Sequence, residues 1–357
     1  MIVETNLTDL VVRPDASVRE ALSRMNATPH LIQLVTDTEG RLVGLVTDGD
    51  IRRGFVNGAN LESPIRECMH IDPITATCVE EAITIISDLS GRRRCVPVID
   101  ESGKLIQIVS DSPQTAGLDT ALIMAGGFGT RLGEKTHKTP KPLLPVAGRP
   151  ILWHLVKDLE EHGIQRILLS VHYLSDQFKT FIDNNKFKID IDVLNESEPL
   201  GTAGALGLLP TDINVPLIVM NGDIITRTDY GAMMAYHQLH ERDATIGASR
   251  YDIEIPFGVL DTDDDGNVSG IREKPRYEHF VSAGIYIVEP TVYKDVVANQ
   301  HLDMPNLLSS AIEKKRKVGL FPIHEYWLDL GRPDDLELAE EESIRWLNSK
   351  AHSEPRE

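Results

Sequence analysis

The first residues that could do chemistry form a glycine-rich turn after a short apolar run. Residues 120–125, Thr-Ala-Leu-Ile-Met-Ala, are typical of a buried parallel strand, and residues 126–131, Gly-Gly-Phe-Gly-Thr-Arg, follow directly. Glycine lets backbone N–H groups come close to a phosphate, while Thr130 offers a hydroxyl and Arg131 a forked cation. The turn predicts a phosphate loop, although it has neither the spaced glycines of dinucleotide folds nor the Gly-Lys-Ser/Thr ending of NTPase loops.

A second cation and a carboxylate follow in separate segments. Lys141 stands between Pro140 and Pro142, and because proline restricts the backbone on both sides, the side chain is positioned reproducibly. Asp223 ends another apolar run, residues 216–223, after a small Asn-Gly pair. A carboxylate at such a place suits Mg²⁺, which prefers hard oxygen ligands and keeps most of its coordination for water and phosphate. These residues predict a site for a phosphorylated ligand and Mg²⁺.

The stretch from residue 125 to residue 146 resembles the signature of the sugar-1-phosphate nucleotidyltransferases. It reads Ala-Gly-Gly-Phe-Gly-Thr-Arg-Leu-Gly, then Glu-Lys-Thr-His-Lys-Thr-Pro-Lys-Pro-Leu-Leu-Pro-Val. The common form of the signature has Pro-Leu where Glu134 and Lys135 stand, outside the positions expected to touch phosphate. The resemblance implies an α/β fold class with a Rossmann-like core and a mostly parallel sheet.

The pattern behind these motifs agrees with that fold class. Residues 166–171 and 191–195 read as strands, and residues 152–162 and 176–184 as helices between them, which is the alternation of a parallel sheet covered on both faces. The first of these helices has Leu152, Leu155, Val156 and Leu159 on one face. Ligands of such sheets bind at the carboxyl ends of the strands, where the motifs fall.

The resemblance also implies roles for residues that contact a nucleoside triphosphate. Arg131 would bind its β- and γ-phosphates and Lys141 its α-phosphate, and Asp329, beside Trp327 and Gly331, would join Asp223 in holding Mg²⁺. The full set expected to line the nucleotide is Leu122, Ala125, Gly126, Gly127, Gly129, Thr130, Glu196, Gly201, Thr202, Ala203, Asn221 and Gly222.

A sugar 1-phosphate would meet a later segment. Residues 257–275 read as a hairpin around Asp265-Gly266 that leads into Glu273-Lys274-Pro275, which resembles the sugar-phosphate element of the family. Glu273 would bind a sugar hydroxyl or amine, Lys274 the sugar phosphate, and Gly284 would close the sugar pocket. Arg131, Lys141, Asp223 and Lys274 are thus the expected catalytic residues.

Glu196 bears on the choice of base. It matches the position where thymidylyl- and uridylyltransferases often carry glutamine, and the segment Glu198-Pro-Leu-Gly-Thr-Ala-Gly that follows is common in mannose-1-phosphate guanylyltransferases. A carboxylate only accepts hydrogen bonds, and guanine presents two adjacent donors, N1–H and the 2-amino group. Glu196 therefore favours GTP, the alternative being a solvated residue at a strand end.

The first third of the chain is an internal repeat. Residues 34–48 align with residues 97–111 at an offset of 63, so that Gly40 matches Gly103, and each copy reads helix, strand, glycine turn, strand. The expected helices carry Val18, Leu22 and Met25 in one copy and Val79, Ile83 and Ile86 in the other. The expected strands are residues 32–36, 42–47, 96–99 and 105–110.

This repeat resembles a CBS-domain pair, a regulatory module that often binds an adenine nucleotide or a similar ligand. In the first copy the family's phosphate- and ribose-binding pattern falls on Thr47 and Asp50. The second copy has Gln107 and Pro113 at the matching glycine and aspartate positions, so we expect a single nucleotide site at most. The alternative is a pair that only makes a dimer or stiffens the assembly.

Composition excludes several classes of partner. The 357 residues carry a formal net charge of −19, with 36 Lys and Arg against 55 Asp and Glu, and the basic clusters are short. We therefore expect no nucleic acid and no membrane as partners. The three cysteines have no CxxC pairing, and the acidic N-terminus is unlike a secretory signal, which makes the cytoplasm the expected compartment.

We expect three domains: CBS repeats over residues 1–58 and 59–115, and a nucleotidyltransferase domain over residues 116–357. The domain order resembles that of guanylyltransferases of bacterial legionaminic acid synthesis, which implies GTP and a hexose 1-phosphate, α-D-glucosamine 1-phosphate first, as substrates with Mg²⁺. The alternatives are mannose 1-phosphate as the sugar, or a silent nucleotide-sugar sensor. CBS pairs often associate face to face, so a homo-oligomer is expected.

Overall fold

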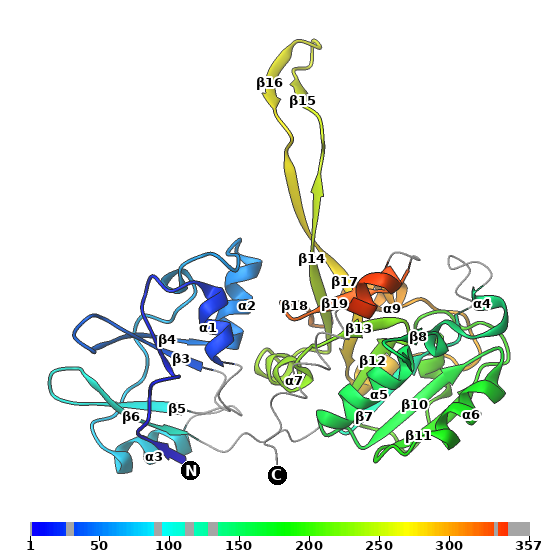
Figure 1. Cartoon of the computed structure of the whole chain (residues 1–357), viewed down its shortest axis with the longest axis horizontal. Helices are drawn as coiled ribbons and strands as arrows, with labels where there is room; N and C mark the ends of the chain where they lie inside the picture. Colours follow the sequence, from blue (N-terminus) through cyan, green and yellow to red (C-terminus); the bar gives the residue numbers. More distant parts are fainter. Residues whose placement is uncertain are drawn as a thin grey trace. The chain divides into compact units, whose positions relative to one another are not determined.

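The computed structural model of the chain describes residues 2–25, 32–88, 95–110, 118–127, 135–331 and 335–341 (Figure 1). Residues 1–116 together with residues 234–240 form one compact unit, and residues 117–233 with 241–357 form the other. The fold is of the mixed α/β class.

Two three-stranded sheets make up the first unit, in the orders β2-β3-β4 and β1-β6-β5. Its strands are β1 (Ile2–Glu4), β2 (Val11–Val12), β3 (Ile32–Thr36), β4 (Leu42–Thr47), β5 (Cys95–Ile99) and β6 (Leu105–Ser110). Its helices are α1 (Val18–Met25), α2 (Asp48–Val56), the short 3-10 helix Ile65–Glu67 and α3 (Val79–Asp88). Ile83 of α3, expected on the apolar face, is 36% exposed, whereas Ile86 is fully buried.

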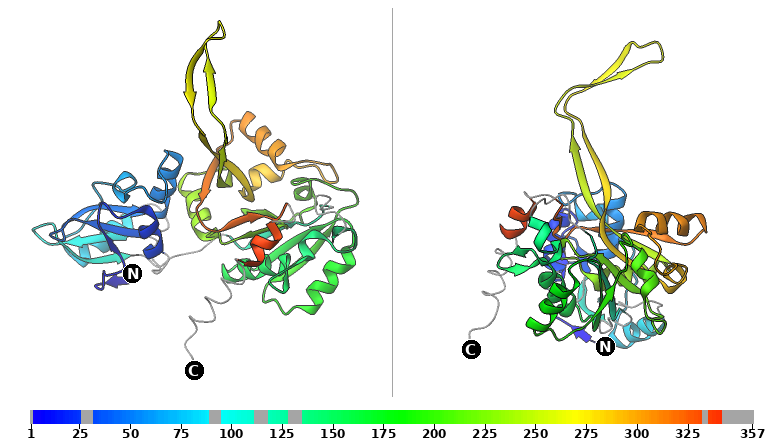
Figure 2. Two further views of the ribbon diagram at one scale, coloured as in Figure 1. Left: turned by 45° about the horizontal axis from the view of Figure 1, so that its top comes forward. Right: turned by 90° about the vertical axis from the view of Figure 1, so that its right-hand side faces the viewer.

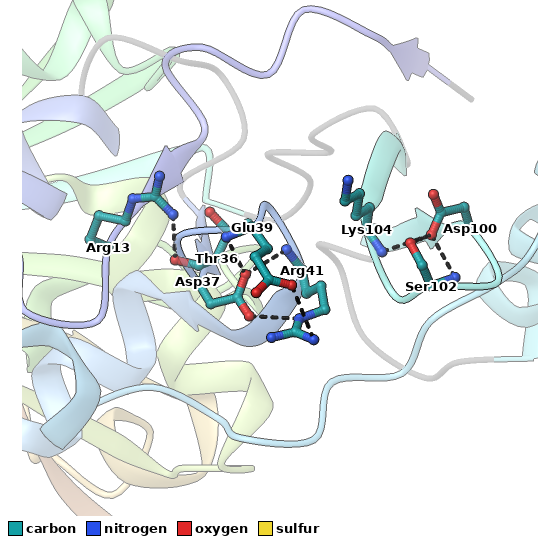
Figure 3. A network of polar contacts seen from close by, with 8 residues as sticks. All are labelled: Arg13, Thr36, Asp37, Glu39, Arg41, Asp100, Ser102 and Lys104. Carbon is teal, nitrogen blue, oxygen red and sulfur yellow. Dashed lines mark hydrogen bonds and ion pairs between the residues drawn. The ribbon is translucent and has the colours of Figure 1, made fainter.

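The two hairpins of this unit, β3-β4 and β5-β6, have equivalent turns (Figure 3). The Asp37 carboxylate accepts hydrogen bonds from the N–H groups of Glu39 and Arg41, and the Asp100 carboxylate accepts them from those of Ser102 and Lys104. Both hairpins also contain a register irregularity, between Val35 and Thr36 and between Val98 and Ile99. These features recur at an offset of 63 residues, as in the sequence alignment.

The two turns also bond to each other. Leu42 N–H donates to the Gly103 carbonyl at 3.0 Å, and Leu105 N–H donates to the Gly40 carbonyl at 3.2 Å. Gly40 and Gly103 have φ angles of 82° and 79°, which glycine adopts without a steric penalty. The repeats are thus linked by reciprocal backbone bonds around a local two-fold relation.

The second unit is built on a seven-stranded sheet in the order β11-β10-β7-β12-β17-β14-β18. These strands are β7 (Thr120–Met124), β10 (Arg166–Val171), β11 (Asp190–Asn195), β12 (Leu217–Asn221), β14 (Ala244–Glu254), β17 (Arg276–Val288) and β18 (Val318–Ile323). The first four run parallel, β14 and β18 are parallel to each other, and β17 is antiparallel to both of its neighbours. The sheet is therefore mostly parallel, as expected.

Helices and short ribbons complete this unit. The helices are α4 (Lys135–Lys138), the 3-10 helices Lys141–Leu143 and Gly204–Leu208, α5 (Ile151–Glu161), α6 (Ser175–Asn184), α7 (Tyr230–Leu239), α8 (Pro290–Tyr293) and α9 (Met304–Glu313). Of these, α7 begins in this unit, and its residues from Met234 on belong to the first unit. The ribbons are β8 (Pro145–Val146) with β9 (Arg149–Pro150), β13 (Ile224–Thr226) with β19 (Trp327–Asp329), and β15 (Val259–Thr262) with β16 (Val268–Arg272). Leu152, Leu155, Val156 and Leu159 of α5 are buried, which confirms the predicted apolar face.

The middle of the sheet sets the position of the site. β7 lies between β10 and β12, so the chain passes to one side of β7 first and to the other side later. At such a reversal the connections leave a crevice at the carboxyl ends of the strands. Those ends carry residues 124–127 after β7 and Asn221 to Asp223 at the end of β12.

β14 and β17 continue beyond the sheet as a long two-stranded ribbon that projects from the second unit (Figure 2). Their ladder runs from Ala244↔Val288 to Glu254↔Arg276, with one irregularity between Ile246 and Ala248. The hairpin β15-β16 forms the outer end, and Gly266, with a φ angle of 84°, lies in its turn, as predicted. We refer to residues 250–280 as the arm.

No helix in the described ranges is long and apolar enough to span a membrane. Cys68, Cys78 and Cys95 are free thiols. Residues 335–341 are helical.

The buried face of α5 carries a carboxyl group. Asp158 is 6% exposed, and burial raises its pKa to about 6, although nearby His162, Tyr230 and Arg227 oppose the shift. The Asp158 Oδ1 atom is 3.8 Å from Nη1 of Arg227 and 3.9 Å from Nδ1 of His162. At a pH between the unfolded and the folded pKa values, such a carboxyl group is mostly protonated in the folded state and mostly ionised in the unfolded chain.

We predict that Asp158 makes the second unit less stable as the pH rises from about 4 to about 6. The folded state binds the extra proton, so the free energy of unfolding falls through this window by up to roughly 3 kcal/mol. Asp158→Asn should gain that amount relative to the wild type between pH 4 and pH 7, measured by urea unfolding. Trp153 and Trp327 belong to this unit and report on it by fluorescence.

Asp176→Asn is the matched control, because the Asp176 side chain is 94% exposed. A difference between Asp158→Asn and wild type that stays constant with pH would contradict the prediction.

Candidate functional site

A pocket of about 240 Å³ lies at the carboxyl ends of the central strands. It is lined by segments that follow β7, β11 and β12, together with one loop before α9. The lining residues are Met124, Ala125, Gly126, Gly127, Lys141, Pro142, Glu196, Pro199, Leu200, Gly201, Thr202, Asn221, Asp223 and His301. Segments far apart in sequence thus meet at the crevice that the strand order creates.

Glu196 presents its carboxylate directly to the glycine turn. Ser170 Oγ donates to its Oε1 atom at 2.6 Å, and the backbone N–H of Leu200 donates to its Oε2 atom at 2.9 Å. A Cβ atom on Gly126 would lie 2.7 Å from Oε1, so a side chain there would displace the carboxylate. Each carboxylate oxygen keeps a further lone pair, and the side chain is held in one orientation at the pocket wall.

Lys141 and Asp223 form the charged pair of the pocket. Lys141 begins the 3-10 helix after Pro140 and is 8% exposed, and its Nζ atom lies 2.5 Å from Oδ2 of Asp223. Gly222 packs closely here, because a Cβ atom on it would lie 2.9 Å from the Met124 carbonyl. The proline-flanked lysine is therefore fixed against the end of β12, as its sequence context predicts.

The backbone of Asp329, the second residue expected to hold Mg²⁺, lies next to that of Asp223. β13, directly after Asp223, pairs with β19, so that Ile224 faces Asp329, and Leu330 N–H donates to the Asp223 carbonyl at 3.1 Å. Among the described residues no group of three metal-ligating side chains occurs. The backbones of Asp223 and Asp329 are therefore adjacent, and carboxylates are the kind of ligand that suits Mg²⁺, which takes its remaining ligands from water and substrate phosphate.

The loop from Leu200 to Gly204 is fixed by residues that the sequence analysis missed. The Asp303 carboxylate accepts a hydrogen bond from Thr202 N–H at 3.1 Å, and the Leu302 carbonyl accepts one from Ala203 N–H at 2.8 Å. His301, next to them, lines the pocket. The Asp-Met-Pro start of α9 was the available signal, since aspartate before a proline at the first helical turn marks a helix N-terminus.

Gly284 contacts the same end of the sheet. Its φ angle is 68°, and a Cβ atom on it would lie 2.6 Å from Nδ2 of Asn221. Trp327 Nε1 donates to the Ala283 carbonyl at 2.8 Å, which ties β19 to β17. Asn221 and Gly284 therefore pack against each other where the predicted nucleotide and sugar sites would meet.

The other predicted site residues lie in three different places. Leu122 and Ala203 are fully buried in the core rather than at the pocket surface. Gly129, Thr130 and Arg131 lie outside the described residues. Glu273 and Lys274 lie on the arm, between β16 and β17, and do not line the pocket.

In the first unit, Thr47 and Asp50 bond to each other at the start of α2. Asp50 Oδ2 accepts from the Thr47 hydroxyl at 2.6 Å and from its N–H at 2.8 Å, and Asp50 N–H donates to the Thr47 hydroxyl at 3.1 Å. This is a capping box, and Arg53 forms an ion pair with the same carboxylate. A separate cavity of about 840 Å³ is lined by other residues of the unit, among them Arg13, Arg24 and Thr36.

Comparison with known families places two matches on the chain. The family described as nucleotidyl transferase matches residues 120–344, and the CBS domain matches residues 5–57.

Among curated proteins the chain is similar to mannose-1-phosphate guanylyltransferases. The catalytic subunit beta of Drosophila pseudoobscura pseudoobscura is 30% identical over 222 residues, which cover 60% of this chain and 60% of that protein. The catalytic subunit beta of Danio rerio is 32% identical over 235 residues, covering 60% and 62%. The chain thus spans about 60% of the length of these relatives.

Among solved structures, the chain is similar to HddC from Yersinia pseudotuberculosis, crystallised in complex with GMP-PN. That protein is 29% identical, with a TM-score of 0.50, and the similarity covers 63% of this chain and 99% of that chain.

We predict that Gly201→Ala destabilises the second unit far more than Gly163→Ala. Both glycines have left-handed φ angles, 76° and 80°, but a Cβ atom on Gly201 would lie 2.8 Å from the Leu302 carbonyl, whereas one on Gly163 meets nothing within 4 Å. Gly163→Ala should cost about 1 kcal/mol for the backbone conformation alone. Gly201→Ala should cost about 2 kcal/mol more, because the loop must move. Urea unfolding followed by tryptophan fluorescence measures both, and equal losses would show that this close approach does not constrain the loop.

Proposed function

The chain belongs to the nucleotidyl transferase family and carries an N-terminal CBS domain, and on this premise we propose that it is a sugar-1-phosphate guanylyltransferase. It would convert GTP and a hexose 1-phosphate into a GDP-sugar and pyrophosphate. One observation above all supports the proposal. A pocket at the strand-order reversal combines a carboxylate aimed at a glycine turn, Glu196 at Gly126, with the Lys141–Asp223 pair.

The proposed reaction needs little general base catalysis. An oxygen of the sugar phosphate is already anionic at neutral pH and attacks the α-phosphorus of GTP, while the bond to the β-phosphate oxygen breaks and pyrophosphate leaves. The barrier lies in bringing two polyanions together in line. Lys141, buried and fixed, would bind the α-phosphate, Arg131 the β- and γ-phosphates and Lys274 the sugar phosphate.

Asp223 and Asp329 would hold Mg²⁺, which when bound neutralises phosphate charge as a Lewis acid. In the structure Asp223 already bonds to Lys141. Substrate phosphates would compete with Asp223 for Lys141, so Asp223 would exchange Lys141 for Mg²⁺ as its cationic partner.

Glu196 supports guanine as the base. Its two oxygens are anchored by Ser170 and by the N–H of Leu200, which leaves the carboxylate rigid and able to accept two parallel hydrogen bonds. Guanine N1–H and its 2-amino group are such a pair of donors. HddC was crystallised in complex with GMP-PN, which agrees with this choice.

For the sugar we propose α-D-glucosamine 1-phosphate, with the product feeding nonulosonate synthesis of the legionaminic acid type. Glu273, which would bind the sugar, is an acid and would favour an amino group over a hydroxyl, and the local excess of acidic residues agrees with an amino sugar. Mannose 1-phosphate is the alternative, since the similar curated proteins carry that name.

We further propose that the first unit regulates this activity by binding an adenine or similar nucleotide at Thr47 and Asp50. A ligand there would have to take over the hydrogen bonds of the capping box, which now satisfy both side chains. A catalytically silent sensor of nucleotide sugars is the competing function, and the retained pair of Lys141 and Asp223 disfavours it.

The test is pyrophosphate release in the presence of Mg²⁺, with each of the five common nucleoside triphosphates paired with glucosamine, N-acetylglucosamine, mannose or glucose 1-phosphate. We expect release with GTP and glucosamine 1-phosphate, at least about a hundredfold faster than with UTP. Release only with GTP and mannose 1-phosphate would support guanylyltransferase activity, with mannose 1-phosphate in place of glucosamine 1-phosphate as the sugar substrate. Release in no combination would favour the sensor.

We predict that Glu196→Gln relaxes the choice of base. An amide offers one acceptor and one donor, so it loses a hydrogen bond to guanine and can pair with uracil or thymine. Turnover per Michaelis constant with GTP should fall about tenfold to a hundredfold, while that with UTP or dTTP rises. Glu198→Gln, an exposed acid two residues along, is the control and should leave the ratio unchanged. An unchanged GTP-to-UTP ratio in Glu196→Gln would remove this residue from base selection.

A further inference from the structure

The arm carries apolar side chains that nothing in its own ribbon covers. Phe257 is 72% exposed, Ile271 69% and Leu260 57%, and Tyr251 and Ile253 near the root are 54% and 45% exposed. Leu260 and Ile271 face each other across the outer hairpin. A lone two-stranded ribbon is marginally stable in water, and such an exposed apolar surface marks an interaction site.

The root of the arm has two different faces. Tyr251 pairs with His279 and Ile253 with Tyr277, which puts aromatic and apolar side chains together on one face. Apart from Phe280, the opposite face is charged: Glu254 forms an ion pair with Arg276 at 2.8 Å, and Arg250 forms one with Glu278. A ribbon with one charged face and one apolar face is suited to bury the apolar one.

Lys274 is the cation of the arm that has no carboxylate partner. Arg250, Arg272 and Arg276 are each in an ion pair, whereas Lys274, in the fully described segment from 244 to 288, makes none. Its φ angle of 44° is uncommon for a side chain other than glycine. The residue is therefore held in a strained backbone conformation with its charge available to an anion.

The pocket, in turn, is short of positive charge. Among its described lining residues Lys141 is the only lysine or arginine, and it is already paired with Asp223. Two phosphorylated substrates would bring several negative charges next to Glu196, Asp223 and Asp329. A further cation is needed where the sugar phosphate would lie.

The arm cannot easily bring Lys274 to the pocket of its own chain. Beyond the irregularity after Ile246, the ladder continues through seven opposed pairs, from Ala248↔Ser282 to Glu254↔Arg276. Figure 2 shows this ribbon leading away from the sheet. Folding it back would break these backbone bonds, whereas a straight arm can reach a neighbouring molecule intact.

We propose that the arm inserts into the site of a second copy of this chain, so that each pocket receives Glu273 and Lys274 from its partner. The inference rests on the proposed function, because it assigns Lys274 to the phosphate of the sugar substrate. The arm leaves the sheet where Gly284 packs on Asn221, at the same edge as the pocket. Under a two-fold axis, two arms that leave the pocket edges can therefore exchange, with their apolar faces buried in an isologous contact.

Complementation between two defective chains tests this exchange. Full-length Lys141→Ala and Lys274→Ala should each lose at least about a hundredfold in turnover with GTP and the sugar 1-phosphate. Co-expressed and co-purified by separate tags, they should recover about a quarter of the wild-type rate in a random mixture, since half of the dimers are mixed and one site in each is intact. A site built within one chain would recover nothing, which would overturn the proposal.

The double variant gives the reverse result. In each mixed dimer of Lys141→Ala/Lys274→Ala with wild type, both sites should be inactive if the arm acts on the partner. Only one site should be inactive if the arm acts on its own chain. Full activity of Lys274→Ala by itself would also overturn the inference, while the guanylyltransferase activity of the wild type would still stand.

Sedimentation tests the arm without relying on turnover. The wild type should be a dimer, and Leu260→Asp should raise its dissociation constant at least about tenfold. Ile312→Asp on α9 is the control, because Ile312 has the same exposed fraction, 57%. A monomeric wild type, or an unchanged Leu260→Asp dimer, would overturn the arm contact even if no substrate were found. Wild type that dimerises through the arm but releases no pyrophosphate would locate the failure in the proposed function.

Discussion

The position of β7 in the sheet is the constraint on which the site depends. Because β10 lies on one side of it and β12 on the other, the loops after β7 and β12 diverge and leave room for a ligand between them. The same reversal brings together Gly126, Glu196 and Asp223, which come from three separate segments of the chain. β17 then adds Gly284 from an antiparallel strand, and the β13-β19 ribbon adds Asp329. A change in strand order would separate every one of these groups.

Local sequence signals were sufficient for the strands and helices that position this site. The run of residues 166–171 matches β10 in both bounds, and the expected helix over residues 152–162 differs from α5 by one residue at each end. Short β-branched runs and a regular apolar face are properties of adjacent residues, so they can be read from the chain alone. The fixed lysine after Pro140 was predictable for the same reason, since proline acts on its immediate neighbours.

Contacts between distant segments were less accessible. Nothing near Thr202 in the sequence indicates that Asp303 will accept its N–H, because that bond depends on how α9 docks beneath the loop. The hairpin at Gly266 was predicted from its turn, but its projection as an arm was not, since an exposed ribbon and a packed one share the same alternation. The repeat at an offset of 63 is the exception: matching turns at Asp37 and Asp100 made a long-range relation visible as self-similarity.

Charge explains why the site is built from pairs. A chain with a formal net charge of −19 repels the polyanions that it would bind, so its pocket needs cations. When the pocket is empty, these cations need carboxylate partners that balance their charge. Lys141 is buried and would be costly to leave alone, and its bond to Asp223 compensates that cost. When a phosphate takes the lysine, the Asp223 carboxylate loses its cationic partner, and a divalent cation can then take the place of the lysine. Nucleotide and Mg²⁺ should therefore bind cooperatively, because each relieves the electrostatic cost that the other creates.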